Sequence, residues 1–385
     1  MTGAPAVGGL ATDRLASHAV RRIRAGSLRP RGALGAPDIV SLATGEPDFP
    51  TPEPIVAAAV DALRSGWTRY GDPNGDPELR QHIAEEAGVA ADEVLITHGG
   101  SAGLASSILA TVDPGDEVVL LDPTYSRYAD QVHLAGGRVR WTPTRPDGHL
   151  DFDLLARALP AARLLVLCNP GNPTGVVLTG DEVHRLAELV RATDTVLLAD
   201  EAYRDLVYDG REFVSLLDVP GLRPNLIFCN TLSKTYAMTG WRIGYVVAPK
   251  PLAAAVSLIH RSLNASVNAA VQRAALVALR TGPDLAAGMR TAYQARRDLM
   301  VRTLATFDTV DPVAAEGAFY AFPRYHAEIA SVDLLALLAE GGVAVRPGSE
   351  FGPAGEGHLR LSFAIDETSI AEGLRRMAAV LAGLG

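Results

Sequence analysis

A lysine between small hydroxyl residues is the strongest sign of chemistry in this sequence. Residues 231–244 read TLSKTYAMTGWRIG, which places Lys234 directly after Ser233 and ahead of Arg242. Lys234 and Lys250 are the two lysines of the chain, and arginine dominates the remaining basic positions. Because arginine stays protonated, only a lysine whose pKa is lowered by burial or by nearby cations can attack a carbonyl and form a Schiff base. The alternative is a surface lysine in a loop between two strands.

Hydroxyl and guanidinium groups around Lys234 suit a phosphate. The apolar run at residues 225–230 predicts a buried strand whose carboxyl end delivers Thr231, Ser233 and Lys234 to a crevice. The guanidinium fork of Arg242 matches phosphate oxygens, and the two hydroxyls donate further hydrogen bonds. A lysine beside such a cradle indicates a phosphorylated aldehyde as the group that the amine attacks.

The same segment resembles the lysine segment of pyridoxal phosphate enzymes of the aspartate aminotransferase-like superfamily, whose signature is S-K-x-x-x-x-x-G-x-R-x-G. This resemblance to class I and II aminotransferases implies an α/β protein of fold type I. Its large domain would contain a mostly parallel, doubly wound, seven-stranded sheet, and its smaller domain would be α+β. The resemblance also implies pyridoxal 5'-phosphate as the cofactor, attached to Lys234, whose freed amine shuttles a proton during the reaction.

Short apolar runs indicate such a sheet independently of the resemblance. From residue 93 onward they alternate with amphipathic helical patterns, and this alternation argues for parallel strands with helices on both faces. Functional residues in such folds gather at the carboxyl ends of the strands. We expect strands at residues 93–97, 117–122, 138–141, 164–169, 195–200, 225–230 and 242–248.

Long helical patterns after residue 250 indicate a change of architecture. Residues 284–307 would bridge to a smaller domain that contains the strand pattern HLRLSFA. We expect residues 1–50 to form an N-terminal arm and part of the small domain. Residues 51–285 would form the large cofactor-binding domain, and residues 286–385 the small C-terminal domain.

Polar motifs stand where three of the expected strands end, and they read HGGSAGL, DPTYSRY and NPGNPTG. Glycines before a helix let backbone amides approach a phosphate, although each motif alone also reads as a turn or a helix start. The resemblance assigns cofactor contacts to residues of every motif: Gly100, Ser101 and Ala102 at the phosphate, Tyr125 stacked on the ring, and Asn172 at the ring hydroxyl.

Asp200 ends the apolar strand within LLADEAYRDL, where a carboxylate has reason to be buried beside a cation. In the family that the chain resembles, this aspartate pairs with the protonated pyridine nitrogen and keeps the ring an electron sink, while Tyr203 bonds the ring oxygen. The alternative, an aspartate that caps a helix, leaves Tyr203 without a role. Asp200, Tyr203 and Lys234 are therefore the expected catalytic residues.

The resemblance also assigns contacts to the substrate and to a second subunit. Gly45, in the turn-rich segment GEPDF, would place its backbone near the substrate carboxylate, which Asn172 would approach as well. Arg360 would clamp the α-carboxylate with its bidentate fork, the alternative being a charge on an edge strand. Tyr70 would reach across a dimer interface to the neighbour's cofactor phosphate, the alternative being a packed loop tyrosine. An obligate homodimer with shared sites follows.

Charge and composition exclude several kinds of partner. The chain has 385 residues and a net charge of −9, and its arginines are spread rather than striped, so we expect neither nucleic acid nor a membrane as a partner. Cys168 and Cys229 belong to no metal-ligand spacing and are expected to be packed thiols. The histidines form no cluster, so no metal is expected. No apolar run approaches a membrane-spanning length.

The amino-terminal region is rich in arginine, as an amphipathic transit peptide would be. We expect instead a mobile arm followed by a short helix at residues 15–24, in a cytoplasmic protein. A secretory signal is excluded because the region lacks the apolar segment that such a signal requires.

The motifs together predict a pyridoxal phosphate-dependent aminotransferase that moves an amino group between an L-amino acid and a 2-oxo acid by a ping-pong mechanism. Two alternatives stay open. The same cofactor on the same fold also serves elimination, decarboxylation or oxidation of amino acids, and the residues above do not separate these reactions. A non-catalytic sensor domain would follow a winged DNA-binding segment, for which we expect the arm to be too short.

Ser101 bears on the choice of substrate. Some aspartate-preferring members of the resembled family carry a lysine at this position, where it reaches the side-chain carboxylate. A serine cannot supply that charge. We therefore predict that neutral or apolar amino acids, or glutamate, serve as donors at least as well as aspartate.

Overall fold

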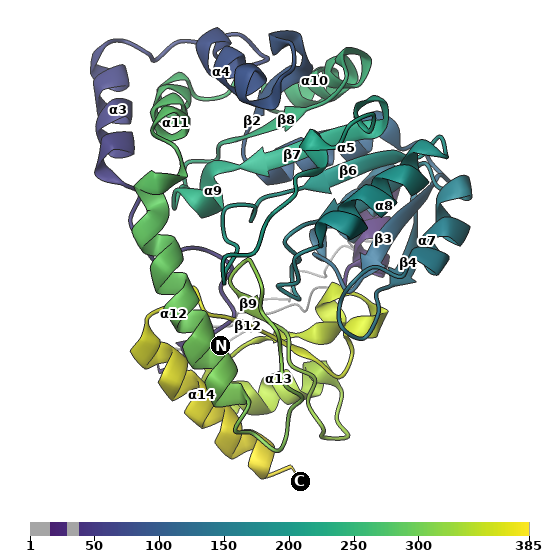
Figure 1. Cartoon of the computed structure of the whole chain (residues 1–385), viewed down its shortest axis with the longest axis vertical. Helices are drawn as coiled ribbons and strands as arrows, with labels where there is room; N and C mark the ends of the chain where they lie inside the picture. The colour runs from purple at the N-terminus through teal and green to yellow at the C-terminus, as the bar shows by residue number, and fades with distance from the viewer. Residues whose placement is uncertain (1–15, 29–37, 385) are drawn as a thin grey trace, which may run out of the picture.

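A seven-stranded sheet lies at the centre of the larger part of the molecule (Figure 1). The structure is a computed structural model that describes residues 16–28 and 38–384. The strands of this sheet are β2 (Val94–Thr97), β3 (Glu117–Asp122), β4 (Arg138–Pro143), β5 (Leu164–Cys168), β6 (Val196–Asp200), β7 (Leu226–Thr231) and β8 (Gly244–Val247). They stand in the order β2-β8-β7-β6-β5-β3-β4, and β8 runs antiparallel to both of its neighbours while the other pairs are parallel. The expected mostly parallel sheet is confirmed.

Helices cover both faces of the sheet. They are α3 (Glu53–Arg64), α4 (Pro77–Ala87), α5 (Gly100–Thr111), α6 (Arg127–Ala135), α7 (Phe152–Ala158), α8 (Gly180–Arg191), α10 (Lys250–Asn264) and α11 (Ala269–Thr281). Val118 and Leu120 pack in one apolar cluster with α5, α6 and α10, whereas Val119 and Leu121 pack in another with α3, α4, α7, α8 and α11. Burial on both faces explains why the strands other than the partly exposed β4 read as continuous apolar runs.

Capping residues set the starts of two of these helices. Asp76 accepts hydrogen bonds from two backbone amides at the start of α4, and Pro77 occupies the first helical position. Thr179 and Glu182 form a capping box at the start of α8. These caps satisfy amides that have no partner within the helix, so each helix begins at a defined residue.

The rest of the chain forms a second group of elements below the large sheet (Figure 1). They are β1 (Val40–Ser41), α12 (Ala287–Leu304), β9 (Tyr320–Ala321), α13 (Ser331–Glu340), β10 (Val343–Ala344), β11 (Arg346–Pro347), β12 (Leu359–Ser362) and α14 (Glu367–Ala382). β1 pairs with β10 in parallel, and β11, β12 and β9 form an antiparallel sheet. The helix expected at residues 284–307 is a 3₁₀ turn followed by α12. The domain boundaries near residues 50 and 285 stay an interpretation.

Short 3₁₀ turns connect several of these elements, at Ala91–Glu93, Leu159–Ala161, Leu216–Asp218, Arg223–Asn225, Pro283–Ala286, Gly348–Phe351 and Pro353–Gly355. The Gly348–Phe351 turn contacts the large part of the molecule, because the backbone amide of Thr124 donates to the carbonyl of Phe351 at 2.7 Å. This contact lies at the junction where the site described below is found.

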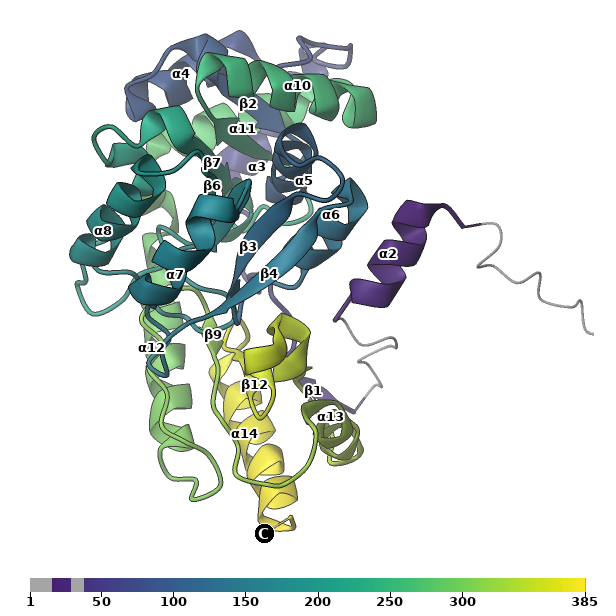
Figure 2. The ribbon, with the colours of Figure 1, turned by 90° about the vertical axis from the view of Figure 1, so that its right-hand side faces the viewer.

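An amino-terminal helix, α2 (His18–Gly26), packs beside α6 (Figure 2). Its Arg22 donates to the carbonyl oxygen of His133 at 2.9 Å, and Ser17 caps its start. The helix expected at residues 15–24 therefore begins later and ends later than the sequence indicated. The rest of the expected mobile arm lies outside the described residues.

Within residues 16–28 and 38–384, no helix has the length and apolarity needed to cross a bilayer.

Candidate active site

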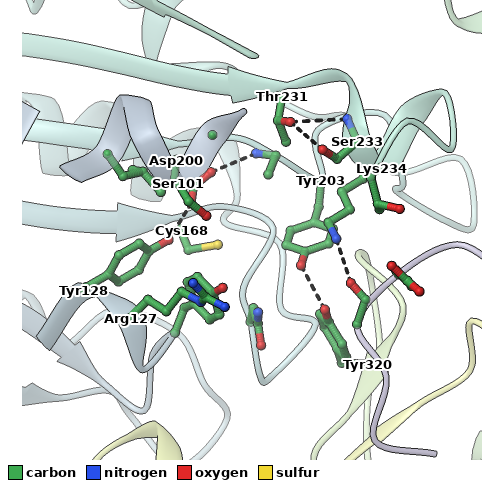
Figure 3. A pocket seen from close by; sticks show the side chains of 18 of the residues that line it. Ser101, Arg127, Tyr128, Cys168, Asp200, Tyr203, Thr231, Ser233, Lys234 and Tyr320 are labelled. Atoms are coloured by element: carbon green, nitrogen blue, oxygen red, sulfur yellow. Dashed lines mark hydrogen bonds between the residues drawn. The ribbon is translucent and has the colours of Figure 1, made fainter. Parts of the chain in front are cut away.

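A cavity of about 480 Å³ lies at the carboxyl ends of the parallel strands and brings together most of the expected site residues (Figure 3). Expected residues that line it are Gly45, Gly100, Ser101, Tyr125, Asn172, Asp200, Tyr203, Thr231, Ser233, Lys234, Arg242 and Arg360. Two expected residues are not part of the wall. Ala102 lies behind Ser101 in the first turn of α5, and the side chain of Tyr70 is 93% exposed in this protomer.

Lys234 belongs to a four-residue helix, α9 (Leu232–Thr235), that follows β7 directly. Thr231 caps this helix by accepting a hydrogen bond from the amide of Ser233 at 3.2 Å. The Lys234 Nζ donates to the carbonyl oxygen of Gly45 at 2.6 Å, and burial in the cavity lowers its pKa to about 8. The alternative of a surface lysine in a loop is therefore wrong. An amine with this pKa is available as a nucleophile or base near neutral pH.

Hydrogen-bond donors converge at one end of the cavity. The amino terminus of α5 begins at Gly100, and the Thr231 and Ser233 hydroxyl oxygens lie 2.8 Å apart beside it. A Cβ atom at Gly99 would lie 2.7 Å from Nη2 of Arg242, so only glycine lets the guanidinium approach this turn. Helix amides, hydroxyls and a guanidinium together form an anion-binding end.

Arg242 itself departs from the expected secondary structure. The sequence predicts that it begins a strand, but β8 starts at Gly244. Arg242 has φ 56°, in the left-handed region, and its Nη1 donates to the carbonyl oxygen of Thr239 at 2.8 Å. This backbone conformation interrupts the strand and turns the side chain toward the anion-binding end of the cavity.

A buried carboxylate occupies another wall of the cavity. Asp200 ends β6 and accepts a 2.6 Å hydrogen bond from the hydroxyl of Tyr128 and a 3.2 Å bond from the amide of Ala202. Burial raises the pKa of Asp200, while the Tyr128 hydrogen bond, the Ala202 hydrogen bond and the Lys234 charge act against this rise. Residues 202–205 form a turn rather than a helix, so the helix-cap alternative for Asp200 is wrong.

Tyrosine hydroxyls join the two parts of the molecule at the cavity. The Tyr203 and Tyr320 oxygens lie 2.9 Å apart, and both side chains are buried. Tyr320 belongs to β9 of the second group of elements, and a Cβ atom at Gly45 would lie 2.6 Å from its hydroxyl oxygen. Gly45 is therefore fixed as glycine by this close approach.

Arg360 reaches the cavity from β12. Its Nη1 donates to Oδ1 of Asn172 at 3.2 Å and its Nη2 to the carbonyl oxygen of Ala43 at 2.8 Å. The guanidinium carbon lies 4.4 Å from the ring centre of Tyr320 and 5.0 Å from that of Phe351. Its Nε has no hydrogen-bond partner in the described part of the chain, although the residue is buried. These contacts hold a guanidinium fork in place at the cavity wall.

Several wall residues were not anticipated from the sequence. They are Ala43, Glu46, Leu104, Arg127, Tyr128, Cys168, Ala202, Thr239, Tyr320, Arg346 and Glu350. Tyr128 had a usable signal, because it lies three residues after Tyr125 and the two rings meet edge to face at 5.4 Å. Arg346 and Glu350 form an ion pair on the side of the second group of elements, and their opposite charges four positions apart are the local signal that could have indicated it.

The two cysteines are both free and buried, and burial raises the pKa of each thiol. Cys168 lines the cavity beside Asp200, whereas Cys229 lies within the sheet. Among the described residues, no group of three or more His, Cys, Asp or Glu side chains has a geometry that could hold a metal ion.

Comparison with known proteins identifies the family. The profile of the family described as aminotransferase class I and II matches residues 37–377. The chain belongs to the class I and II aminotransferases. An arginine–pyruvate transaminase of Pseudomonas aeruginosa is 35% identical to this aminotransferase over 90% of this chain and 91% of the relative. A probable aspartate/prephenate aminotransferase of Thermus aquaticus is 38% identical over 93% and 94%, respectively.

The solved structures that are similar to this chain are also aminotransferases. The aspartate aminotransferase of Thermus thermophilus with maleate superposes with a TM-score of 0.86 at 34% identity, covering 94% of this chain and 98% of that one. The aromatic aminotransferase of Pyrococcus horikoshii superposes with a TM-score of 0.87 at 32% identity, covering 95% and 99%. The names of these relatives differ in substrate, so amino-group transfer is the activity they share.

Proposed function

We propose that this aminotransferase uses pyridoxal 5'-phosphate to move an amino group between an L-amino acid and a 2-oxo acid. The observation that carries the proposal is the Lys234 amine, which stands in the cavity with a pKa lowered to about 8. The second lysine offers no such chemistry. Lys250 is exposed, and its amine is paired with Asp92 at 2.6 Å.

The chemistry of the wall fits the cofactor at both of its charged ends. The amides of α5, the hydroxyls of Ser101 and Ser233, and Arg242 suit a phosphate dianion. The buried Asp200 suits a protonated pyridine nitrogen, because a buried carboxylate stays charged when a cation contacts it. Tyr125 supplies an aromatic face in the same cavity. The end of the cavity with Arg242 and the hydroxyls therefore suits the phosphate of pyridoxal phosphate, and the end with Asp200 suits its pyridine nitrogen.

Each residue then has a defined task. When bound, pyridoxal phosphate supplies an aldehyde that condenses with amines and a protonated ring that withdraws electrons from the substrate's α-carbon. Asp200 would pair with the protonated ring nitrogen and favour its charged form, and the hydroxyl of Tyr203 would donate a hydrogen bond to the ring oxygen. The Lys234 amine would accept the proton from the substrate's α-carbon in one half-reaction and give a proton back to the α-carbon in the other, a role that its lowered pKa favours.

Substrate binding falls to the residues between the two parts of the molecule. Arg360 has a free Nε and a fork already oriented by Asn172 and Ala43, so it binds the α-carboxylate at little entropic cost. A 2-oxo acid carries the same carboxylate as an amino acid. One arginine therefore serves both half-reactions, as a ping-pong mechanism requires.

A homodimer with shared sites is part of the proposal. The Tyr70 side chain is 93% exposed in the protomer, and it belongs to a loop whose Trp67 is exposed as well. Both features are what a loop that docks on a second copy requires. In this arrangement the partner's Tyr70 would bond the cofactor phosphate. A cytoplasmic location remains a prediction from the sequence.

The proposal is tested by loading the protein with pyridoxal phosphate and screening amino-acid donors against 2-oxo acid acceptors, while absorbance spectra and products are followed together. We expect stoichiometric transfer of the amino group and alternation between two spectral forms of the holoenzyme. Release of ammonia, carbon dioxide or hydrogen peroxide in place of transfer would identify elimination, decarboxylation or oxidation. Absence of any turnover with a bound cofactor would favour the sensor alternative.

A further inference from the structure

Arg127 is a cation of the cavity wall that the proposed reaction leaves without a task. It occupies the first position of α6, and its side chain extends toward the cavity beside Tyr128 (Figure 3). More than a third of its surface is exposed. Within residues 16–28 and 38–384, its guanidinium takes part in no hydrogen bond or ion pair. A charged fork at the wall of a substrate cavity is thus available for a ligand.

The other cations of the wall already have partners. Arg346 is paired with Glu350 in an ion pair, and Arg360 is held by Asn172 and by the carbonyl oxygen of Ala43. The proposed reaction uses Lys234 for the proton and Arg242 for the phosphate. Arg127 is the cation of the wall that remains when these are assigned, so its guanidinium is available to an anionic group that enters the cavity.

The position of Arg127 is set by contacts on two sides. Its neighbour Ser126 donates to Oε1 of Glu350 at 3.2 Å, which ties the start of α6 to the Gly348–Phe351 turn. Gln131, four residues later on the same face of α6, donates to the carbonyl oxygen of Ser101 at 3.3 Å. Because helical side chains lean toward the amino end, Arg127 projects beyond the Ser101 contact into the cavity.

We propose that Arg127 binds the distal carboxylate of a dicarboxylic substrate. The proposal rests on the proposed function and names the substrate class of that same site. Arg360 holds the α-carboxylate, and Arg127 supplies a second guanidinium fork that matches the other carboxylate in bidentate geometry. Ser101 offers only a hydroxyl at this wall, so the charge that selects an acidic side chain comes from α6.

Solvent exposure sets the size of the expected effect. A buried arginine–carboxylate pair would change binding by two to three orders of magnitude, but an exposed one is weakened by solvent and salt. We therefore expect about tenfold discrimination, which corresponds to about 1.4 kcal/mol. The discrimination should shrink as the salt concentration rises, because the pair is open to solvent on one side.

The test measures binding and turnover separately on the holoenzyme. Glutarate and pentanoate are matched probes, because they differ in the presence of the second carboxylate, and neither can react. We expect glutarate to bind about tenfold more tightly than pentanoate, and Arg127→Met to remove most of this difference. The ratio of kcat/KM for glutamate to that for norvaline should fall by a similar factor. Arg127→Lys should retain part of the preference.

A matched control is Arg138→Met. Arg138 is exposed at the amino end of β4, away from the carboxyl ends where the cavity lies, and its substitution changes the net charge equally. We expect this variant to keep both ratios. Equal binding of glutarate and pentanoate by the wild type, or an unchanged ratio in Arg127→Met with an unaltered holoenzyme spectrum, would overturn the proposal. The binding comparison requires no turnover, so its outcome can be distinguished from failure of the proposed function, in which no donor and acceptor pair exchanges an amino group.

Discussion

The hydroxyl of Tyr128 donates a 2.6 Å hydrogen bond to Oδ2 of Asp200, and both side chains are buried. The two residues come from α6 and from the end of β6. Burial raises the pKa of Asp200, and this hydrogen bond is the largest of the influences that lower it. If Asp200 pairs with the cofactor nitrogen, the Tyr128 hydrogen bond favours the charged form of the carboxylate that this pairing requires.

Tyr128→Phe should therefore lower the affinity of the protein for pyridoxal phosphate, because Asp200 loses a hydrogen bond that favours its charged form. Loss of a hydrogen bond to a charged group costs roughly 1.5–3 kcal/mol, so we expect the Kd for pyridoxal phosphate to rise by about tenfold or more. Fluorescence titration of the apoprotein measures it. Tyr325→Phe serves as the control, because that hydroxyl bonds the carbonyl oxygen of Ile329 outside the cavity. Equal affinities in Tyr128→Phe and the wild type would show that the hydrogen bond does not support Asp200.

Lys234→Met should stabilise the cofactor-free protein. Burial lowers the pKa of Lys234 from 10.5 to about 8. Below pH 8 the buried charge therefore destabilises the folded state, whereas the same charge is hydrated in the unfolded state. Removing the amine should raise the free energy of unfolding by about 1–3 kcal/mol at pH 7.

The pH dependence gives this prediction its sign. Between pH 8 and pH 10.5 the unfolded state binds more protons at this lysine than the folded state does, so the wild type gains stability as pH rises. The advantage of Lys234→Met should thus be full at pH 7 and vanish by pH 10.5. Urea titrations at pH 7 and pH 10.5 measure the free energy of unfolding of both proteins. The same difference between Lys234→Met and the wild type at both pH values would mean that Lys234 is not desolvated.

Arg360→Met should damage substrate binding and spare the cofactor. Removing one partner of a buried charged pair typically costs about 2–5 kcal/mol, so we expect KM for both the amino acid and the oxo acid to rise by at least about 30-fold. Arg324→Met, at an exposed position, is the comparison. Steady-state kinetics with retained cofactor absorbance measures the effect. Comparable rates of the wild type on amino acids and on simple amines would argue against the clamp.

Tyr70 tests whether two subunits share each site. Tyr70→Phe should raise the Kd for pyridoxal phosphate by about tenfold, because only the hydroxyl that bonds the phosphate is lost. Mixing this variant with Lys234→Ala should restore activity, since hybrid dimers contain one site with both native residues. An unchanged Kd together with no recovery on mixing would place Tyr70 outside the neighbour's site.

The fold could be predicted from the sequence because the large sheet is buried on both faces. Every strand of the large sheet except the edge strand β4 appeared as an apolar run, and the polar motifs marked the carboxyl ends where the cavity lies. Local patterns gave element types more reliably than bounds. Arg242, for example, belongs to an apolar run but adopts φ 56°, and a positive φ at a residue other than glycine leaves no trace in composition.

Contacts between distant segments are what the sequence could not supply. The Tyr203 and Tyr320 hydroxyls meet across 117 positions, and Tyr128 and Asp200 across 72. The Tyr203–Tyr320 pair depends on how the two parts of the molecule pack, and the Tyr128–Asp200 pair on how α6 packs against the end of β6, so no local motif predicts either pair. Arg127 was overlooked for the same reason, since its position matters only once α6 is seen to form a cavity wall.

The central claim is that Lys234 is the residue that carries the cofactor. The most direct measurement is borohydride reduction of the protein loaded with pyridoxal phosphate, followed by proteolysis and mass spectrometry of the labelled peptides. The account predicts one phosphopyridoxyl group per chain, fixed on Lys234, and an unlabelled Lys250, whose exposed amine is paired with Asp92. A label on Lys250, or no label on Lys234 in a protein that transfers amino groups, would contradict it.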